Sequence, residues 1–192
     1  MTVVFFDLEM AGLELHHPII QLAAVVYDGG VELSSFERKL KFDKAIASPE
    51  ALEINHYSDE AWKDAVPPRQ AVCEFTRWLD DFKSVQMTSK KGKTFHLARL
   101  SGYNAVAFDV PRLQKLFNDF SLFFPCHFLC LDVYQAVAWY FQWNPEQKPE
   151  NLKLGTVCDH FGIVIEKAHD ALSDVRATAQ LAEALKFWFQ KA

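Results

Sequence analysis

Near its N-terminus the chain reads Val3-Val4-Phe5-Phe6-Asp7-Leu8-Glu9, four β-favouring apolar residues followed by two acids. Such an apolar run is typical of a buried strand. Side chains alternate along a strand, so Asp7 and Glu9 lie on one face, about 6.6 Å apart. Like charges this close repel strongly unless a cation lies between them. The stretch therefore indicates a divalent-metal site, although a strand that ends in solvent is an alternative explanation of its acids.

Two further acids stand at predicted helix starts. Asp109 follows a strand end and a turn, with Asn104 as the expected helix cap and Pro111 in the first turn. Asp174 stands in the first turn of the last predicted helix, and His169 precedes it by five residues. That helix has an apolar stripe with the spacing of one helical face, at Leu172, Val175, Ala179, Ala182, Leu185 and Phe189.

The order of these residues resembles the three motifs of the DnaQ-like, or DEDDh, exonuclease family. The motifs are Asp7-x-Glu9, Asn104-x-x-x-Phe108-Asp109 and His169-x-Ala171-x-x-Asp174. Gly12-Leu13 and the segment 48–55 also fit the family, and the resemblance spans residues 3 to about 185. It implies an α/β, ribonuclease-H-like fold with a mixed five-stranded sheet flanked by helices, and one exonuclease domain over residues 1–192.

The resemblance also implies roles for particular side chains. The expected ligands of two Mg²⁺ or Mn²⁺ ions are Asp7, Glu9, Asp109 and Asp174, since hard oxygen ligands suit these cations. His169 is the expected general base, because imidazole titrates near neutrality; a purely structural cap is the alternative. The expected substrate-binding residues are Leu13, Leu52, Asn55 and Asn104. Leu13, Leu52 and Asn55 could equally serve packing.

The leading functional hypothesis is a metal-dependent 3′–5′ exonuclease that acts on single-stranded or frayed DNA and releases 5′-mononucleotides. An exoribonuclease is the enzymatic alternative, because the first and third motifs also resemble those of oligoribonuclease. The segments 48–55 and 104–109 look more like DNA-directed and ribonuclease T-like members. A polymerase-docking or nucleic-acid-binding module without activity is the non-enzymatic alternative, and a polymerase is a possible partner in either case.

Composition bounds these readings. The chain has 192 residues, 50% of them hydrophobic, and a formal charge of -5, which does not by itself indicate a nucleic-acid binder. Bound cations would reverse the field at the acidic site. The basic cluster Lys90, Lys91 and Lys93 favours a solvated loop tip, with a phosphate-binding patch second. No membrane span or signal peptide is evident, so we expect an intracellular protein.

The four cysteines indicate buried free thiols rather than disulfides or a zinc site at Cys126, His127 and Cys130. The neighbours Phe128, Leu129 and Leu131 are expected in the core. Trp143 and Tyr103 are the two candidates for stacking on bases. Strands are expected near residues 2–8, 19–27, 33–42, 95–100 and 127–131, and helices near 49–55, 58–64, 69–82, 108–120 and 133–141.

Overall fold

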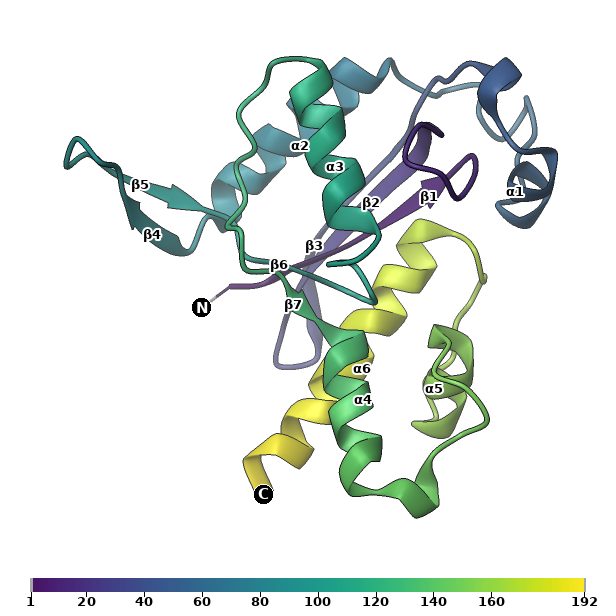
Figure 1. The fold of residues 1–192 in the computed structure, drawn as a ribbon, viewed down its shortest axis with the longest axis vertical. Coiled ribbons are helices and arrows are strands. Elements are labelled where there is room, and N and C mark those ends of the chain that lie inside the picture. Colours follow the sequence, from purple (N-terminus) through teal and green to yellow (C-terminus); the bar gives the residue numbers. More distant parts are fainter. Residues whose placement is uncertain (1, 192) are drawn as a thin grey trace.

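The computed structural model describes residues 2–191 and consists of a five-stranded sheet between two layers of helices (Figure 1). The strand order is β3-β2-β1-β6-β7. The strands are β1 (Val4–Met10), β2 (Ile19–Asp28), β3 (Val31–Lys39), β6 (Leu100–Gly102) and β7 (Leu131–Asp132). β1 pairs antiparallel with β2 and parallel with β6. The predicted α/β fold with a mixed five-stranded sheet is thereby confirmed.

β1, β2 and β3 form an antiparallel meander. The turn between β2 and β3 holds Gly29 and Gly30 at φ values of 58° and 83°. Glycine adopts this left-handed conformation without steric cost, so the predicted hairpin turn forms there. Alternation along β1 places Phe6 and Leu8 in one hydrophobic core and Phe5 in the core on the other face. The face of Phe5 is also the face of Asp7 and Glu9.

Helices cover both faces of the sheet. The α-helices are α1 (Pro49–Ile54), α2 (Pro68–Leu79), α3 (Asp109–Asp119), α4 (Val133–Trp143), α5 (Leu154–His160) and α6 (Ala171–Lys191). Buried residues of α2 and α3, including Phe75 and Leu113, pack on the face of Phe6. Residues of α4, α5 and α6, including Val137, Val157 and Val175, pack on the other face. The side chain of Phe189, last in the predicted stripe, lies outside the described residues.

Two predictions of local structure were wrong on helices. Residues 58–64 form turns instead of a helix, because Trp62 is buried and its indole N–H donates to the Ile20 carbonyl at 3.1 Å. This tertiary anchor replaces the helical ladder. Asn104 does not cap α3, since it has a φ of 57° and lies five residues before the helix begins at Asp109. The short helix α5 was not predicted, because seven residues are too few to show a helical period.

The predicted strand 95–100 is divided. β5 (Thr94–Leu97) pairs with β4 (Val85–Thr88) in a separate hairpin, while β6 joins the main sheet. The predicted strand 127–131 shortens to β7. Its apolar neighbours are exposed, at 81% for Phe128, 48% for Leu129 and 45% for Leu131, so their placement in the core was wrong. In this segment Cys126 and Cys130 fill the core instead.

All four cysteines are free thiols, and all but Cys73 are buried. Burial raises the pKa of Cys130 and of Cys158 to about 12 in each case, so both stay protonated. Among the described residues, Cys126, His127 and Cys130 do not form a group with metal-site geometry. None of the helices in the described part of the chain is both long enough and apolar enough to cross a membrane.

Candidate active site

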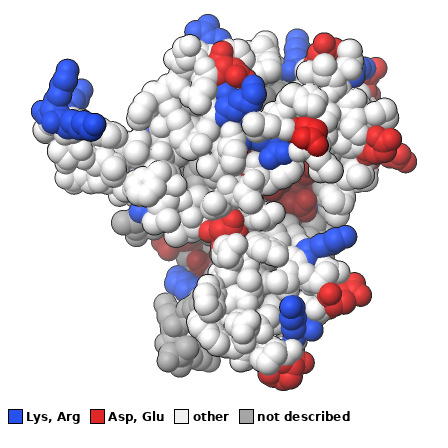
Figure 2. Space-filling model, in the orientation of Figure 1, with Lys and Arg blue, Asp and Glu red and all other residues white. Residues whose placement is uncertain are grey.

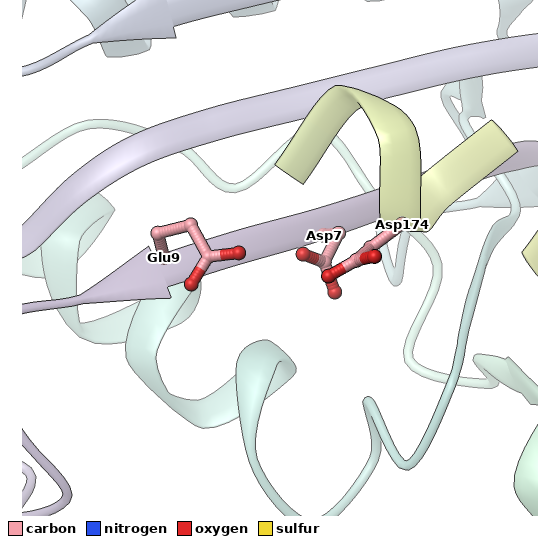
Figure 3. Close-up of side chains that lie close together, drawn as sticks. All are labelled: Asp7, Glu9 and Asp174. Carbon is pink, nitrogen blue, oxygen red and sulfur yellow. The ribbon is translucent and has the colours of Figure 1, made fainter. Parts of the chain in front are cut away.

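Three carboxylates from two elements meet at the middle of the sheet. Asp7 and Glu9 project from β1, and Asp174 projects from the first turn of α6. Each offers an oxygen that lies within 4.8 Å of the others. Figure 3 shows the carboxylates of Asp7 and Asp174 close together, with Glu9 further along the strand. The two-residue spacing on β1 and the start of α6 together create the cluster.

A fourth carboxylate, that of Asp109, reaches the same cavity from the first residue of α3. The residue is only 5% exposed, and the nearby backbone of Leu8 favours the charged form of its carboxyl by lowering its pKa. Gly102 makes this approach possible: a Cβ there would lie 2.7 Å from the Cβ of Ala105 and 2.9 Å from the Phe6 carbonyl oxygen. The absence of a side chain lets the turn after β6 pass directly against β1.

Burial raises the pKa of every one of these acids, and repulsion within the cluster adds to this effect at Asp7 and Glu9. Burial, and then the charges of its neighbours, raise the pKa of Asp7 well above its usual range. The same two causes raise the pKa of Glu9 to about 8. Burial raises the pKa of Asp109 to about 7, opposed in part by the nearby Arg112 guanidinium. Burial also raises the pKa of Asp174 to about 6. Without a cation the cluster is a concentrated, poorly solvated set of acids.

The donor set fits a hard divalent cation. The three clustered ligands are all carboxylate oxygens, which Mg²⁺ and Mn²⁺ prefer, and no described thiol or imidazole belongs to the cluster. A cation would also offset the repulsion that raises these pKa values. The prediction that Asp7, Glu9 and Asp174 share a metal site therefore agrees with their geometry, and Asp109 stands beside them.

His169 lies at the rim of the site, in the loop before α6. Its side chain is exposed, and its backbone has a φ of 59°, the left-handed region. The backbone N–H of His169 donates to Oδ2 of Asp174 at 3.1 Å. The carboxylate thus holds the loop in a conformation that most residues avoid, and it keeps His169 next to the cluster.

These side chains line a cavity of about 240 Å³. The lining residues are Asp7, Leu8, Glu9, Tyr103, Asn104, Phe108, Asp109, Leu154, His169 and Asp174. Figure 2 shows acidic side chains recessed in a hollow of the surface near the start of α6. The structure therefore brings all five predicted catalytic residues, together with Asn104, to one cavity.

The other three predicted substrate-binding residues do not line this cavity. Leu13 is 79% exposed. Leu52 packs against the small core that contains Trp62. Asn55 is buried, and its Nδ2 donates to the Met10 carbonyl at 2.7 Å. Their contact with substrate stays a prediction, and the visible contacts of Leu52 and Asn55 are structural.

The two aromatic candidates for base stacking differ in position. Tyr103 lines the cavity, and its hydroxyl donates to the Leu152 carbonyl at 2.6 Å, which ties the loop before α5 to the site. Trp143 does not line it and instead stacks on Trp188, with ring centroids 5.4 Å apart. Only Tyr103 is placed to meet a substrate in this cavity.

Asp132 is a supporting residue that the sequence motifs did not reveal. Its Oδ1 accepts hydrogen bonds from the backbone N–H groups of Asn104 and Tyr134, and its Oδ2 accepts one from Val106, all at 3.0 Å. One carboxylate therefore caps α4 and holds the turn that carries Asn104 and leads to Asp109. The position of Asp132 just before a predicted helix could have indicated the cap from neighbouring residues, but its contact with the turn joins residues far apart in the sequence.

Arg112 is a second supporting residue absent from the predictions. It is buried in α3, and its guanidinium donates to the carbonyls of Phe108 and Leu13 and lies over the Phe108 ring. It thereby joins the loop after β1 to the start of α3, beside Asp109. Sequence carried no sign of this role, since an arginine within an amphipathic helix is ordinarily exposed.

The exonuclease family model named for ribonuclease T matches residues 4–182. The chain belongs to this exonuclease family. The DnaQ-like assignment drawn from the motifs is confirmed, as is the class of enzyme, a phosphodiester hydrolase. The matched range contains all four acids and His169, so the residues of the cavity lie within the part of the chain that the family model covers.

Longer proteins contain regions similar to this exonuclease domain. The PolC-type DNA polymerase III of Bacillus cereus is 26% identical over 181 residues, which is 94% of this chain and 11% of that protein. Escherichia coli exonuclease I with a dT13 oligonucleotide aligns with a TM-score of 0.76 and 20% identity, over 96% of this chain and 41% of that chain. Its zinc-bound complex with single-stranded DNA aligns with a TM-score of 0.77 and 21% identity, over 97% and 40%. These likenesses confirm the fold.

Proposed function

We propose that this chain is a 3′–5′ exonuclease that hydrolyses single-stranded or frayed DNA and releases 5′-mononucleotides. The observation that carries the proposal is the cluster of Asp7, Glu9 and Asp174, whose oxygens lie within 4.8 Å of one another in a cavity that His169 also lines. A cluster of partly buried like charges costs stability, so its presence calls for a function. We further propose that residues 1–192 form one such domain.

Each side chain of the cavity has a proposed role. Asp7, Glu9 and Asp174 would hold a divalent cation, Mg²⁺ or Mn²⁺, and Asp109 would support a second. Bound there, the two cations would lower the pKa of water and stabilise charge on the phosphate. His169 would accept the proton of the attacking water, since its imidazole stands at the rim within reach of solvent. Asn104 and Tyr103 would position the terminal nucleotide.

The relatives favour DNA over RNA as the substrate. The aligned exonuclease I structures contain single-stranded DNA, and the Bacillus relative is a DNA polymerase. A polymerase or another replication protein is accordingly the proposed partner. The chain spans 11% of that relative's length and 41% of the dT13-bound exonuclease I, so the function of the longer proteins does not transfer as a whole.

Matched DNA and RNA oligomers labelled at the 5′ end test the proposal, in Mg²⁺, in Mn²⁺ and in EDTA. We expect a ladder that shortens from the 3′ end of DNA in either metal and no cleavage in EDTA. Faster shortening of RNA would establish the exoribonuclease alternative. Cleavage of a covalently closed single-stranded circle would contradict an exonuclease. Absence of cleavage of every substrate in both Mg²⁺ and Mn²⁺ would favour a binding module.

A further inference from the structure

The β4–β5 hairpin (Val85–Thr88 and Thr94–Leu97) projects away from the body of the molecule (Figure 1). Its turn carries Lys90, Lys91 and Lys93, and Figure 2 shows Lys and Arg side chains gathered at its tip. No Asp or Glu occurs anywhere from residue 85 to residue 97, in a chain of formal charge -5. Positive charge is thus concentrated on one protruding element of an acidic protein.

Backbone contacts, and not the lysine side chains, build the tip. The Ser89 and Lys93 backbones pair at 2.9 Å, the Gly92 N–H donates to the Ser89 carbonyl at 2.9 Å, and Ser89 Oγ accepts from the Lys93 N–H at 3.0 Å. Lys90, Lys91 and Lys93 are exposed, and none takes part in an ion pair with another described residue. Three neighbouring like charges with no acidic partner repel one another, and a polyanion would relieve that repulsion.

The side chains beside the lysines favour nucleic acid over protein as the polyanion. One face of the hairpin exposes the cross-strand pairs Gln86–His96 and Thr88–Thr94, all of which can hydrogen-bond to phosphate or sugar oxygens. The apolar pair Met87–Phe95 lies on the other face and is only partly exposed. Protein interfaces are depleted in lysine and rich in exposed aromatic anchors, the reverse of this tip.

The hairpin stands apart from the cavity. It projects from the end of the sheet where β1 begins, whereas Asp7 lies at the middle of that strand and Glu9 lies near its other end. We propose that the hairpin is a phosphate-binding arm, which contacts a nucleic-acid strand at nucleotides remote from the 3′ end held in the cavity. The remote position rests on the proposed function, while phosphate binding by the arm does not.

The test compares two triple variants. The arm variant is Lys90→Ala with Lys91→Ala and Lys93→Ala. The control variant removes three exposed lysines elsewhere, by Lys41→Ala, Lys63→Ala and Lys148→Ala. Both variants lose the same charge. The tip lysine side chains support no described contact of the fold, and of the control lysines Lys63 forms only an exposed ion pair with Glu60, so the thermal unfolding of both variants should match that of the wild type. Binding is measured by fluorescence anisotropy in EDTA, where hydrolysis is absent, with single strands of about 6 and about 30 nucleotides.

The arm variant should bind the longer strand roughly tenfold more weakly at about 0.1 M salt. Its plot of log affinity against log salt should flatten by about 2, since each lost phosphate contact to a single strand contributes about 0.7. The arm variant should bind the short strand, and hydrolyse it in Mg²⁺, as well as the wild type does. The control variant should match the wild type in every measurement. Salt-dependent loss of long-strand binding would support the arm even if neither protein hydrolyses DNA.

Two results would overturn the proposal. The first is that the arm variant binds long DNA and long RNA with the same affinity and the same salt dependence as the wild type. An acidic protein surface would then remain as the partner of the hairpin. The second is an equal loss on the short and the long strand, which would mean that the lysines act at the cavity and not at a remote site.

Discussion

At the scale of single residues, Asp7 combines burial with repulsion from four neighbouring acids, and this combination makes it the sharpest test of the metal site. Asp7→Asn keeps the shape of the side chain and removes its charge. Activity should fall roughly 10³-fold or more, as when a group that organises transition-state charge is lost. The metal-free variant should melt a few degrees higher than the wild type, because the remaining acids repel less.

The matched control for this variant is Asp64→Asn, which makes the same chemical change at an exposed turn. It should leave both activity and melting temperature near those of the wild type. Nuclease assays at saturating Mg²⁺ and calorimetry in EDTA measure the two effects. Activity of Asp7→Asn within tenfold of the wild type would remove Asp7 from the metal site.

His169 offers a second test at this scale, because its backbone conformation limits which substitutions are informative. Asparagine tolerates a φ of 59° well, so His169→Asn should keep the loop and the N–H donated to Asp174. If the imidazole is the general base, kcat should fall by roughly 10² to 10⁴ with little change in KM. The acidic limb of the rate profile, measured at saturating metal, should also shift or disappear. Near-normal turnover with an unchanged limb would make His169 a structural residue only.

At the scale of elements, the turn from β6 to α3 depends on Asp132 at the start of α4. Asp132→Ala leaves three backbone N–H groups without their acceptor, at about 1 kcal/mol or somewhat more for each bond. We expect a destabilisation of roughly 3 kcal/mol and a loss of activity, because Asn104 and the approach to Asp109 lose their support. Asp132→Asn, which keeps one oxygen, should lie between this variant and the wild type.

The control for Asp132 is Asp43→Ala. Asp43 caps a short 3₁₀ helix (Lys44–Ile46) by accepting from the Ala45 N–H, and it does not line the cavity. The Asp43→Ala variant should be less stable than the wild type but should keep the specific activity of the wild type. Denaturant unfolding, steady-state kinetics and hydrogen exchange at the Asn104 and Val106 amides measure these effects. Unchanged exchange at both amides in Asp132→Ala would show that the turn holds itself.

At the scale of the whole molecule, the raised pKa values make stability depend on pH. The pKa of Glu9 is about 8 and that of Asp109 about 7, whereas both would titrate near 4 in the unfolded chain. Between these limits the folded state holds protons that the unfolded state has released, so folding becomes less favourable as pH rises. Each such proton contributes a slope of about 1.4 kcal/mol per pH unit.

The metal-free protein should therefore melt at least about 5 °C lower at about pH 8 than at about pH 5. Saturating Mg²⁺ should recover the loss at about pH 8 and do little at about pH 5, because protonated carboxyls bind the cation poorly. Glu9→Gln should flatten the dependence. Calorimetry across this range measures it, and a metal-free melting temperature that rises with pH would contradict the clustered acids.

Sequence alone determined the features that depend on neighbours along the chain. Alternation on β1 put Asp7 and Glu9 on one face, and the apolar spacing of the last helix put Asp174 in its first turn. The glycine pair after β2 specified a hairpin turn. Each of these features depends on two to four consecutive residues or on the period of a helix. The order of the motifs along the chain was therefore enough to indicate the family.

Tertiary structure alone decided which of these surfaces meet. Asp109 reaches β1 because β6 lies beside it and Gly102 lets the turn pass, and Asp132 supports that turn from 26 and 28 residues away. The division of the predicted strand 95–100 likewise follows from two pairings, of β5 with the neighbouring β4 and of β6 with the distant β1. Local patterns encode what an element is and which side is apolar, whereas long-range packing selects its partner, because that choice is made by the free energy of the whole core.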